Sequence, residues 1–316
     1  MEPADADDTL GGVGEGTVLA RIFPRLPSAT SQLLGPGDDA AVVAAPDGRF
    51  VVTTDMMIHG PDFRLAWSTP FDLGWKAAAS NLADVAAMGA TPTALVVAIA
   101  APADTPVSTL EGIADGLREG CAAMAPGCGV VGGDLSVSDT LTIAVTAFGD
   151  LDGRAPVTRS GARVGDVVAV AGVLGQSAAG LRLLFAHGVT EPGALRDDAV
   201  VIAQLRPNPP VALGVAAALA AATSMIDLSD GLALDARRVG IASGVALDLS
   251  RDAVGSREAL DGGEDHSLLA TFPASPPEGF RVIGRVVEGL GVLVDGVAYE
   301  ARGGWDPYAD WSGEAG

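Results

Sequence analysis

The order of its apolar segments is the feature that most constrains how this chain can fold. Short strand-like runs alternate with longer helix-like segments, and Gly-, Pro- and Asp-rich turns join them. Such alternation predicts a mixed α/β (α+β) protein. In the N-terminal half the expected order is approximately ββαβαββ, after a short helix over 18–26. The strands are expected over 38–45, 49–54, 93–100, 130–131 and 140–148, and the helices over 72–88 and 109–125.

Two local signals sharpen this prediction. The turn Pro46-Asp47-Gly48 is expected to join the first two strands as a hairpin. Asp72 is expected to be the N-cap of the first long helix, and Gly89 is expected to end it.

A polar, turn-rich segment over 150–156 predicts a domain boundary. A second α/β unit follows it. Its strands are expected over 166–171, 224–227, 282–287 and 292–294, and its helices over 177–185, 211–222 and 232–240. We therefore expect an acidic, Gly-rich flexible arm over 1–16, an N-terminal domain over 17–150 and a C-terminal domain over 151–316.

Composition narrows the function classes. A chain of 316 residues that is 48% hydrophobic can bury two cores, and 42 glycines with only 4% aromatic residues favour α/β over a β-sandwich. The net charge of −21 argues against nucleic acid and anionic membranes as partners. Cys121 and Cys128 lack the spacing of a zinc site or a disulfide framework. With no signal peptide and no convincing membrane span, the expected location is the cytoplasm.

The acidic residues carry the functional signal. Most lie at the ends of apolar runs beside Gly, Ala, Ser or Thr, where a backbone can approach a ligand closely. Carboxylates that converge from several strand ends suit Mg²⁺ that bridges to substrate phosphates. The alternative, that each Asp is a helix cap or turn former, stays open for any single residue. The six clusters are Gly37–Ala41, Thr53–Asp55, Asn81–Asp84, Gly132–Asp134, Ile226–Gly231 and Gly262–Asp265.

Several nucleotide-binding motifs are absent or misplaced. The chain has no P-loop, because its single lysine, Lys76, is followed by alanine. The protein-kinase motifs are also missing. The run Gly127–Gly132 matches GxGxxG, but an expected helix precedes it and an expected strand follows it, the reverse of a dinucleotide-binding unit. The scattered histidines, His59, His187 and His266, are interpreted as surface or packing residues.

Taken in order, these clusters resemble the bacterial thiamine-monophosphate kinase family over residues 35–308, nearly the whole chain. Further matching segments are Gly74–Ala77, Ala87–Ala90, Thr158–Ala162 and the tail Gly304–Tyr308. The resemblance implies the two-domain fold of aminoimidazole ribonucleotide synthetase, with an N-terminal domain that dimerises through its sheet. It also implies direct in-line phosphoryl transfer from ATP to thiamine monophosphate, with several Mg²⁺ ions.

The resemblance also implies roles for individual residues. The metal ligands would be Asp39, Thr53, Thr54, Asp55, Asp84, Asp134, Asp227 and Asp230. ATP would contact Gly133, Asp134, Arg159 and Ser229, and thiamine monophosphate would contact Asp62, Glu264 and Trp305. These roles agree with the residue chemistry: Arg159 could clamp a phosphate and Trp305 could face the cationic ring. Ordinary packing, ion-pair and capping roles for Trp305, Arg159 and Ser229 are the alternatives.

Asp62 and Lys76 differ from the other candidate residues. The family usually has His where this chain has Asp62, in Gly60-Pro61-Asp62-Phe63, so either Asp62 has another role or the acceptor binds differently. Lys76 is expected to pair with a carboxylate near the metals rather than to act on the phosphates.

Three other functions remain as alternatives. One is another ATP-using enzyme of the superfamily, of the selenophosphate or purine-pathway synthetase type, although residues 1–35 lack the Cys and Lys expected of the selenium enzyme. The second is a non-catalytic nucleotide- or metal-binding regulator. The third is a metal-dependent phosphohydrolase. Each of these alternative functions can be tested with the purified protein.

Overall fold

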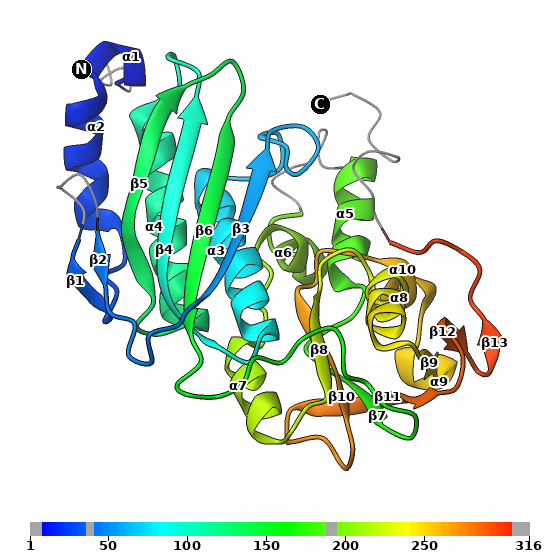
Figure 1. The fold of residues 1–316 in the computed structure, drawn as a ribbon. Helices are drawn as coiled ribbons and strands as arrows, with labels where there is room; N and C mark the ends of the chain where they lie inside the picture. The colour runs from blue at the N-terminus through cyan, green and yellow to red at the C-terminus, as the bar shows by residue number, and fades with distance from the viewer. Residues whose placement is uncertain (1–7, 36–40, 188–194, 305–316) are drawn as a thin grey trace.

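The computed structural model of the chain describes residues 8–35, 41–187 and 195–304, and its strands form three sheets (Figure 1). The two-stranded sheet pairs β1 (Gln32–Leu34) with β2 (Val42–Val43). The four-stranded sheet has the order β3 (Val51–Ile58), β6 (Thr142–Asp150), β4 (Thr91–Ala101), β5 (Gly129–Val137). Its strands are antiparallel except for the parallel pair β4–β5. This mixture of sheets and helices confirms the predicted fold class.

The seven-stranded sheet is built from residues 167–298. Its order is β13 (Val297–Ala298), β12 (Gly291–Val294), β9 (Ala246–Leu249), β11 (Phe280–Val287), β7 (Val167–Ala171), β10 (Ser267–Phe272), β8 (Ser224–Leu228). Its helices are α5 (Gln176–His187), α6 (Ala199–Leu205), α7 (Val211–Leu219), α8 (Leu232–Ser243), α9 (Arg251–Val254) and α10 (Arg257–Asp261). Strand β8 lies at one edge of this sheet, as β3 does in the four-stranded sheet.

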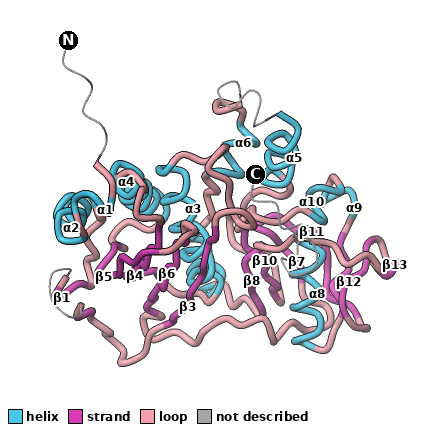
Figure 2. Tube along the Cα trace, turned by 90° about the horizontal axis from the view of Figure 1, so that it is seen from above, coloured by secondary structure: helices cyan, strands magenta, loops and turns pink. Residues whose placement is uncertain are grey.

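Helices α3 (Pro70–Ala87) and α4 (Val107–Met124) pack together on one side of the four-stranded sheet (Figure 2). The predicted helix 72–88 begins two residues earlier, because Thr69 is the N-cap and Asp72 completes a capping box from the third helical position. Gly74 allows the two helices to approach closely, since a Cβ there would lie 2.0 Å from the carbonyl oxygen of Ile113.

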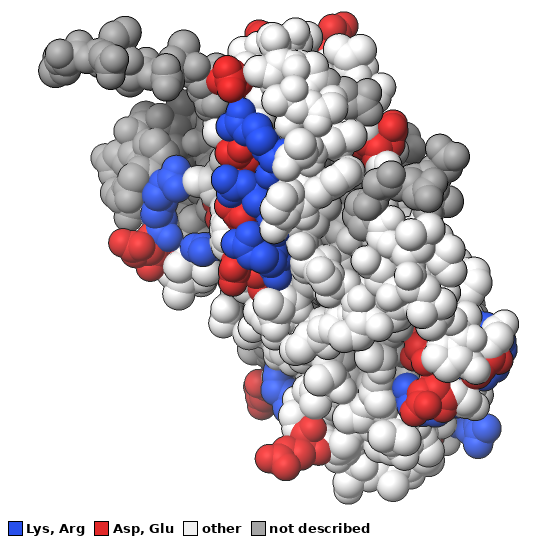
Figure 3. Space-filling model, turned by 90° about the vertical axis from the view of Figure 1, so that its left-hand side faces the viewer, with Lys and Arg blue, Asp and Glu red and all other residues white. Residues whose placement is uncertain are grey.

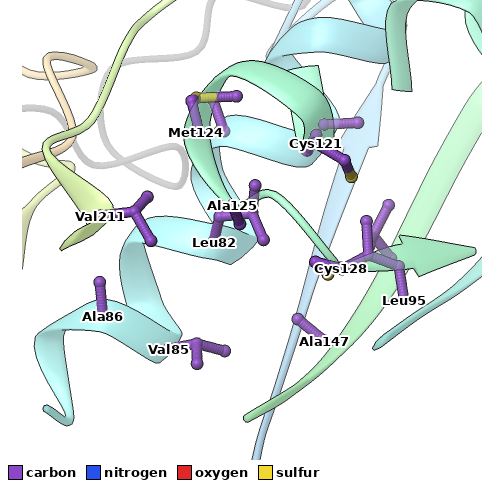
Figure 4. Close-up of a cluster of buried hydrophobic side chains, with 14 of the residues drawn as sticks. Leu82, Val85, Ala86, Leu95, Cys121, Met124, Ala125, Cys128, Ala147 and Val211 are labelled. Atoms are coloured by element: carbon purple, nitrogen blue, oxygen red, sulfur yellow. The ribbon is translucent and has the colours of Figure 1, made fainter. Parts of the chain in front are cut away.

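One hydrophobic core joins the two larger sheets. Leu82 and Val85 of α3 lie in it together with Cys121, Cys128 and Val211 of α7 (Figure 4). Strand β10 contributes alternate residues to two cores: Leu268, Ala270 and Phe272 face the shared core, whereas Leu269 faces a second core under α8. This period of two is the normal alternation of a buried strand. Helix α3 is therefore held between the sheets.

The N-terminal region differs from the prediction. The expected arm over 1–16 is corrected for residues 8–16, because α1 (Leu10–Val13) and the start of α2 (Glu15–Ile22) are helical. Leu10 and Gly11 donate backbone hydrogen bonds to Thr105 and Ala103, which tie this region to the segment before α4. The helix expected over 18–26 is the second half of α2 with a 3₁₀ turn, η1 (Phe23–Arg25).

The hairpin expected over 38–54 is wrong. Gly48 donates to the carbonyl of Ala45, so the predicted turn exists. The strands on either side of it pair with different partners, however: β2 pairs with β1, and β3 pairs with β6 over eight residues. The long ladder of β3 with β6 outweighs the local turn signal, because cross-strand pairs accumulate along a strand.

Candidate active site

The candidate site lies where the two edge strands β3 and β8 meet helix α3. Helix α3 packs against β3 and β6 of the four-stranded sheet and against β8 and β10 of the other sheet. Each of the three elements contributes a carboxylate: Asp55 from β3, Asp84 from α3 and Asp227 from β8. Residues up to 172 positions apart in sequence are thus brought to one place between the two sheets.

The three carboxylates are close enough to perturb one another. Burial raises the pKa of Asp84 to about 7, and repulsion from Asp227 and Asp55 adds to this effect. The hydroxyl of Thr53 donates to Asp84 Oδ2 at 2.7 Å and opposes it. Burial also raises the pKa of Asp55, with further repulsion from Asp227 and against the attraction of His266. The cluster therefore has an excess of negative charge that a cation would relieve.

His266 is a site residue that the sequence reasoning missed. It is buried, and its Nδ1 lies 3.5 Å from Asp227 Oδ2. Burial opposes protonation, but contact with Asp227 and the charge of Glu264 together raise the pKa of His266. The signal that could have identified it is its position directly after the Gly262–Asp265 cluster.

The loop that carries Glu264 and His266 has a constrained backbone. Glu264 (φ 70°) and His266 (φ 51°) both adopt left-handed conformations, which are uncommon for non-glycine residues and often occur at functional sites. Glu264 donates its N–H to the carbonyl of Ser229 at 2.7 Å. A Cβ on Gly263 would lie 2.6 Å from the same oxygen, so only glycine fits there. The two sequence clusters Ile226–Gly231 and Gly262–Asp265 thus form one packed unit.

Lys76 and Glu264 form an ion pair beside the carboxylate cluster. Burial disfavours the Glu264 carboxylate, but Lys76 and then His266 outweigh it and lower the pKa of Glu264. Asp62 is nearby: its pKa is raised by burial and by Glu264, against Lys76 and the N–H of Ile58. Asp62 Oδ2 accepts that N–H at 2.7 Å and so closes the turn after β3. Lys76 therefore pairs with a carboxylate, as the sequence predicted.

Some predicted site residues lie away from this cluster. The side chain of Thr54 points to the opposite face of β3, where it bonds to Val145 and Thr146. Gly133 and Asp134 lie on β5, which is separated from β3 by β6 and β4, a distance of roughly 14 Å at ordinary strand spacing. Arg159 is exposed in the segment between β6 and β7.

The remaining predicted residues divide into two groups. Ser229 and Asp230 follow β8 directly, and Arg238 Nη1 donates to Asp230 Oδ2 at 2.6 Å. Asp39 and Trp305 lie outside the described residues. The site described here is therefore the part contributed by α3, β3, β8 and the loop before β10.

The donor set fits Mg²⁺ bound jointly with phosphate. In residues 8–35, 41–187 and 195–304, no three His, Cys, Asp or Glu side chains are close enough to hold a metal ion by themselves. Mg²⁺ in phosphoryl-transfer sites is usually held by one or two carboxylates, and substrate phosphates and waters complete its shell. Carboxylates that repel one another without a compensating cation match this requirement.

Comparison with known proteins places the chain in a class. Residues 37–151 match the family model described as AIR synthase related protein, N-terminal domain. Together with the sheets described above, this match defines an AIR synthase-like protein of two α/β parts. None of the helices in the described ranges is long and apolar enough to cross a membrane.

Individual relatives narrow the class. The chain is 45% identical over 325 residues to the thiamine-monophosphate kinase of Mycobacterium tuberculosis, covering 97% of this chain and 95% of that protein. It is similar to the solved thiamine-monophosphate kinase of Stenotrophomonas maltophilia K279a, with 30% identity, a TM-score of 0.76 and coverage of 90% and 96%. A structure of AaThiL complexed with AMPPCP and TMP gives 33% identity, a TM-score of 0.72 and coverage of 84% and 90%. The chain belongs to the thiamine-monophosphate kinase family and is a phosphotransferase.

Proposed function

We propose that this enzyme transfers the γ-phosphoryl group of ATP to thiamine monophosphate, giving ADP and thiamine diphosphate. A phosphate oxygen of the acceptor forms the new bond to the γ-phosphorus as the bond to the ADP oxygen breaks, without a phosphoenzyme. The observation that carries this proposal is the convergence of Asp55, Asp84 and Asp227 beside the Lys76–Glu264 pair. The solved complex of AaThiL with AMPPCP and TMP supports it.

We propose that Asp55, Asp84 and Asp227 hold Mg²⁺ together with ATP phosphates. The ions would neutralise the charge that develops on the transferring group. Thr53 fixes the orientation of the Asp84 carboxylate. Asp39, Thr53, Thr54, Asp134 and Asp230 remain proposed as further metal ligands, and Gly133, Asp134, Arg159 and Ser229 as ATP contacts. Thr54 could offer a metal ion only its backbone carbonyl oxygen, since its hydroxyl faces away from the cluster.

We propose that Glu264 and Asp62 form the acceptor end of the site, with Trp305 from the tail. Glu264 carries the lowered pKa expected of a carboxylate that faces a cation. Asp62 replaces the family's usual His, and its bond to Ile58 indicates that it shapes the acceptor loop rather than donating a hydrogen bond to phosphate.

We also propose a homodimer formed through the four-stranded sheet, with residues 17–150 as the N-terminal domain and 151–316 as the C-terminal domain. Val52 and Met56 of β3 are 54% and 58% exposed on the face opposite α3. Figure 3 shows a column of mixed basic and acidic side chains beside a broad uncharged surface on the side of α2 and β5. In such a dimer, Asp134 of the second copy would join the carboxylate cluster of the first. Asp134 of the same copy lies on β5, away from that cluster.

Mixing two inactive variants tests the dimer. If Asp55 of one copy and Asp134 of the other serve one site, Asp55→Asn and Asp134→Asn proteins that are refolded together should regain about a quarter of wild-type activity, since half of the dimers would hold one intact site. Proteins that are mixed without subunit exchange are the control. No recovery, with mixed dimers shown by differential tagging, would place both residues in one copy or exclude Asp134.

The reaction itself is tested by following ADP and thiamine diphosphate with Mg²⁺, with and without thiamine monophosphate. We expect thiamine diphosphate in a one-to-one ratio with ADP. ADP without the diphosphate would favour a phosphohydrolase or another acceptor of the superfamily, and other small phosphorylated amines would then be screened. Nucleotide binding without any turnover would favour a regulator.

A further inference from the structure

Lys76 is buried, and the proposed chemistry gives it no contact with either substrate. Its side chain is 8% exposed, whereas that of its partner Glu264 is 38% exposed. Lysine is rarely buried unless it is paired. The ion pair joins α3, which covers the four-stranded sheet, to the loop before β10 of the seven-stranded sheet. Through this ion pair, Lys76 on the four-stranded sheet side fixes Glu264, which belongs to the part of the chain that forms the seven-stranded sheet.

A second set of contacts fixes Lys76 from the side of α6. With its amide oxygen turned towards Lys76, Gln204 accepts from Nζ at 3.2 Å and donates to the carbonyl of Ser177 at 3.2 Å. Ser177 in turn donates its N–H to Asp265 Oδ1 at 2.9 Å. These contacts lead from Lys76 through Gln204 and Ser177 to Asp265, the residue next to Glu264. The position of the ammonium group is therefore set before any ligand binds.

Two carboxylates share the charge of Lys76. Glu264 and Asp62 both interact with the Lys76 ammonium, and Glu264 also interacts with His266. Without Lys76, the two carboxylates would repel each other, and Glu264 would have no fixed direction. With it, the Glu264 carboxylate is held in one position, where it can meet a ligand that carries a positive ring.

We infer that Lys76 is a positioning residue of the acceptor site, which aims the partly exposed Glu264 carboxylate at the cationic ring of the acceptor. This inference rests on the proposed function, because the acceptor's positive ring is what Glu264 would meet. It predicts that Lys76 governs acceptor affinity and leaves nucleotide affinity alone.

The test is a double-mutant cycle with Lys76→Met and Glu264→Gln, read as KM and kcat for thiamine monophosphate and as binding of a nonhydrolysable ATP analogue with Mg²⁺. Each single variant should raise the acceptor KM at least about tenfold. The double variant should be no worse than the weaker single variant, since both changes remove one contact. Lys76→Arg should restore much of the acceptor affinity, and analogue binding should stay within about twofold throughout.

Other outcomes overturn the inference. Additive effects on the acceptor KM would show that Lys76 and Glu264 act separately. Weakened binding of the ATP analogue by Lys76→Met, with the acceptor KM unchanged, would assign Lys76 to the phosphates. The same cycle in thermal unfolding measures the ion pair without any acceptor. If the wild-type enzyme binds the ATP analogue but not thiamine monophosphate, the proposed function fails, and unfolding coupling alone would then reduce Lys76 to a structural link.

Discussion

The N-terminal half of helix α3 (its Lys76 end) and its C-terminal half (its Asp84 end) compensate negative charge in opposite ways. Lys76 and Asp84 are eight residues apart, about 12 Å along the helix axis. At the Lys76 end, Glu264 is paired with an ammonium, and its pKa is lowered. At the Asp84 end, carboxylates from three elements repel one another, and burial together with this repulsion raises the pKa of Asp84 to about 7.

The difference indicates where an external cation is needed. The Lys76 end carries its own compensating charge, which suits the organic acceptor that we propose binds there. The Asp84 end has His266 against Asp227 and the Thr53 hydroxyl against Asp84, and these do not offset the repulsion. On the proposed function, a triphosphate at this end would need divalent ions between the carboxylates and the phosphates.

The largest effect is expected from removing a carboxylate at the Asp84 end. Asp55→Asn should lower kcat about 10²-fold or more, because a charge that would hold Mg²⁺ against the phosphates is lost. Its melting temperature should stay the same or rise, because a buried, repelled carboxylate becomes neutral. The assay follows thiamine diphosphate formation, and calorimetry follows unfolding. A variant that loses activity and also melts much earlier would show that Asp55 is structural.

A smaller effect concerns stability and pH in the absence of divalent ions. Because the pKa of Asp84 is raised from 3.8 to about 7, the folded state binds more protons than the unfolded state between these values. Through Asp84 alone, stability should therefore fall as pH rises from about 4 to 7, by roughly 4 kcal/mol at most at about 1.36 kcal/mol per pKa unit. Urea unfolding with a chelator measures this slope.

A second buried acid, Asp235, should contribute to the same slope. Burial at the start of α8 raises the pKa of Asp235 to about 7, partly offset by Arg238. Asp84→Asn should therefore remove a large part of the slope, and Asp84→Asn/Asp235→Asn a larger part, with the raised pKa values of Asp55, Asp62 and Asp265 contributing the rest. Mg²⁺ with an ATP analogue should flatten the wild-type slope. An unchanged slope in Asp84→Asn would refute the electrostatic account of this end.

Local patterns were enough to predict much of this site. The helix around Lys76 and Asp84 was expected over 72–88 and observed as Pro70–Ala87, because its helical spacing and Gly89 stop are local signals. Asp227 was expected at the end of a strand and lies near the end of β8, whereas Asp55 was expected just after a strand and lies inside β3, which continues to Ile58.

What the sequence did not predict depends on long-range packing. His266 could not be identified as a site residue from the sequence. Its partner Asp227 is 39 positions away, and its backbone N–H donates to the carbonyl of Leu228. Strand β10 was not predicted because its residues Ser267–Phe272 face cores on both sides and lack a polar alternation. The hairpin over 38–54 failed because distant strands offered longer pairing.

The smallest predicted effect separates two adjacent residues that the sequence treated alike. Thr53 and Thr54 were both predicted as metal ligands, but strand alternation sends their side chains to opposite faces of β3. Thr53→Val removes the hydroxyl that orients Asp84 and should lower kcat roughly tenfold. Thr54→Val keeps its backbone carbonyl and should change kcat within about twofold. Equal losses in the two variants, measured with saturating Mg²⁺ and ATP, would mean that the Thr54 hydroxyl face also supports catalysis, and the contrast between the faces of β3 would then be lost.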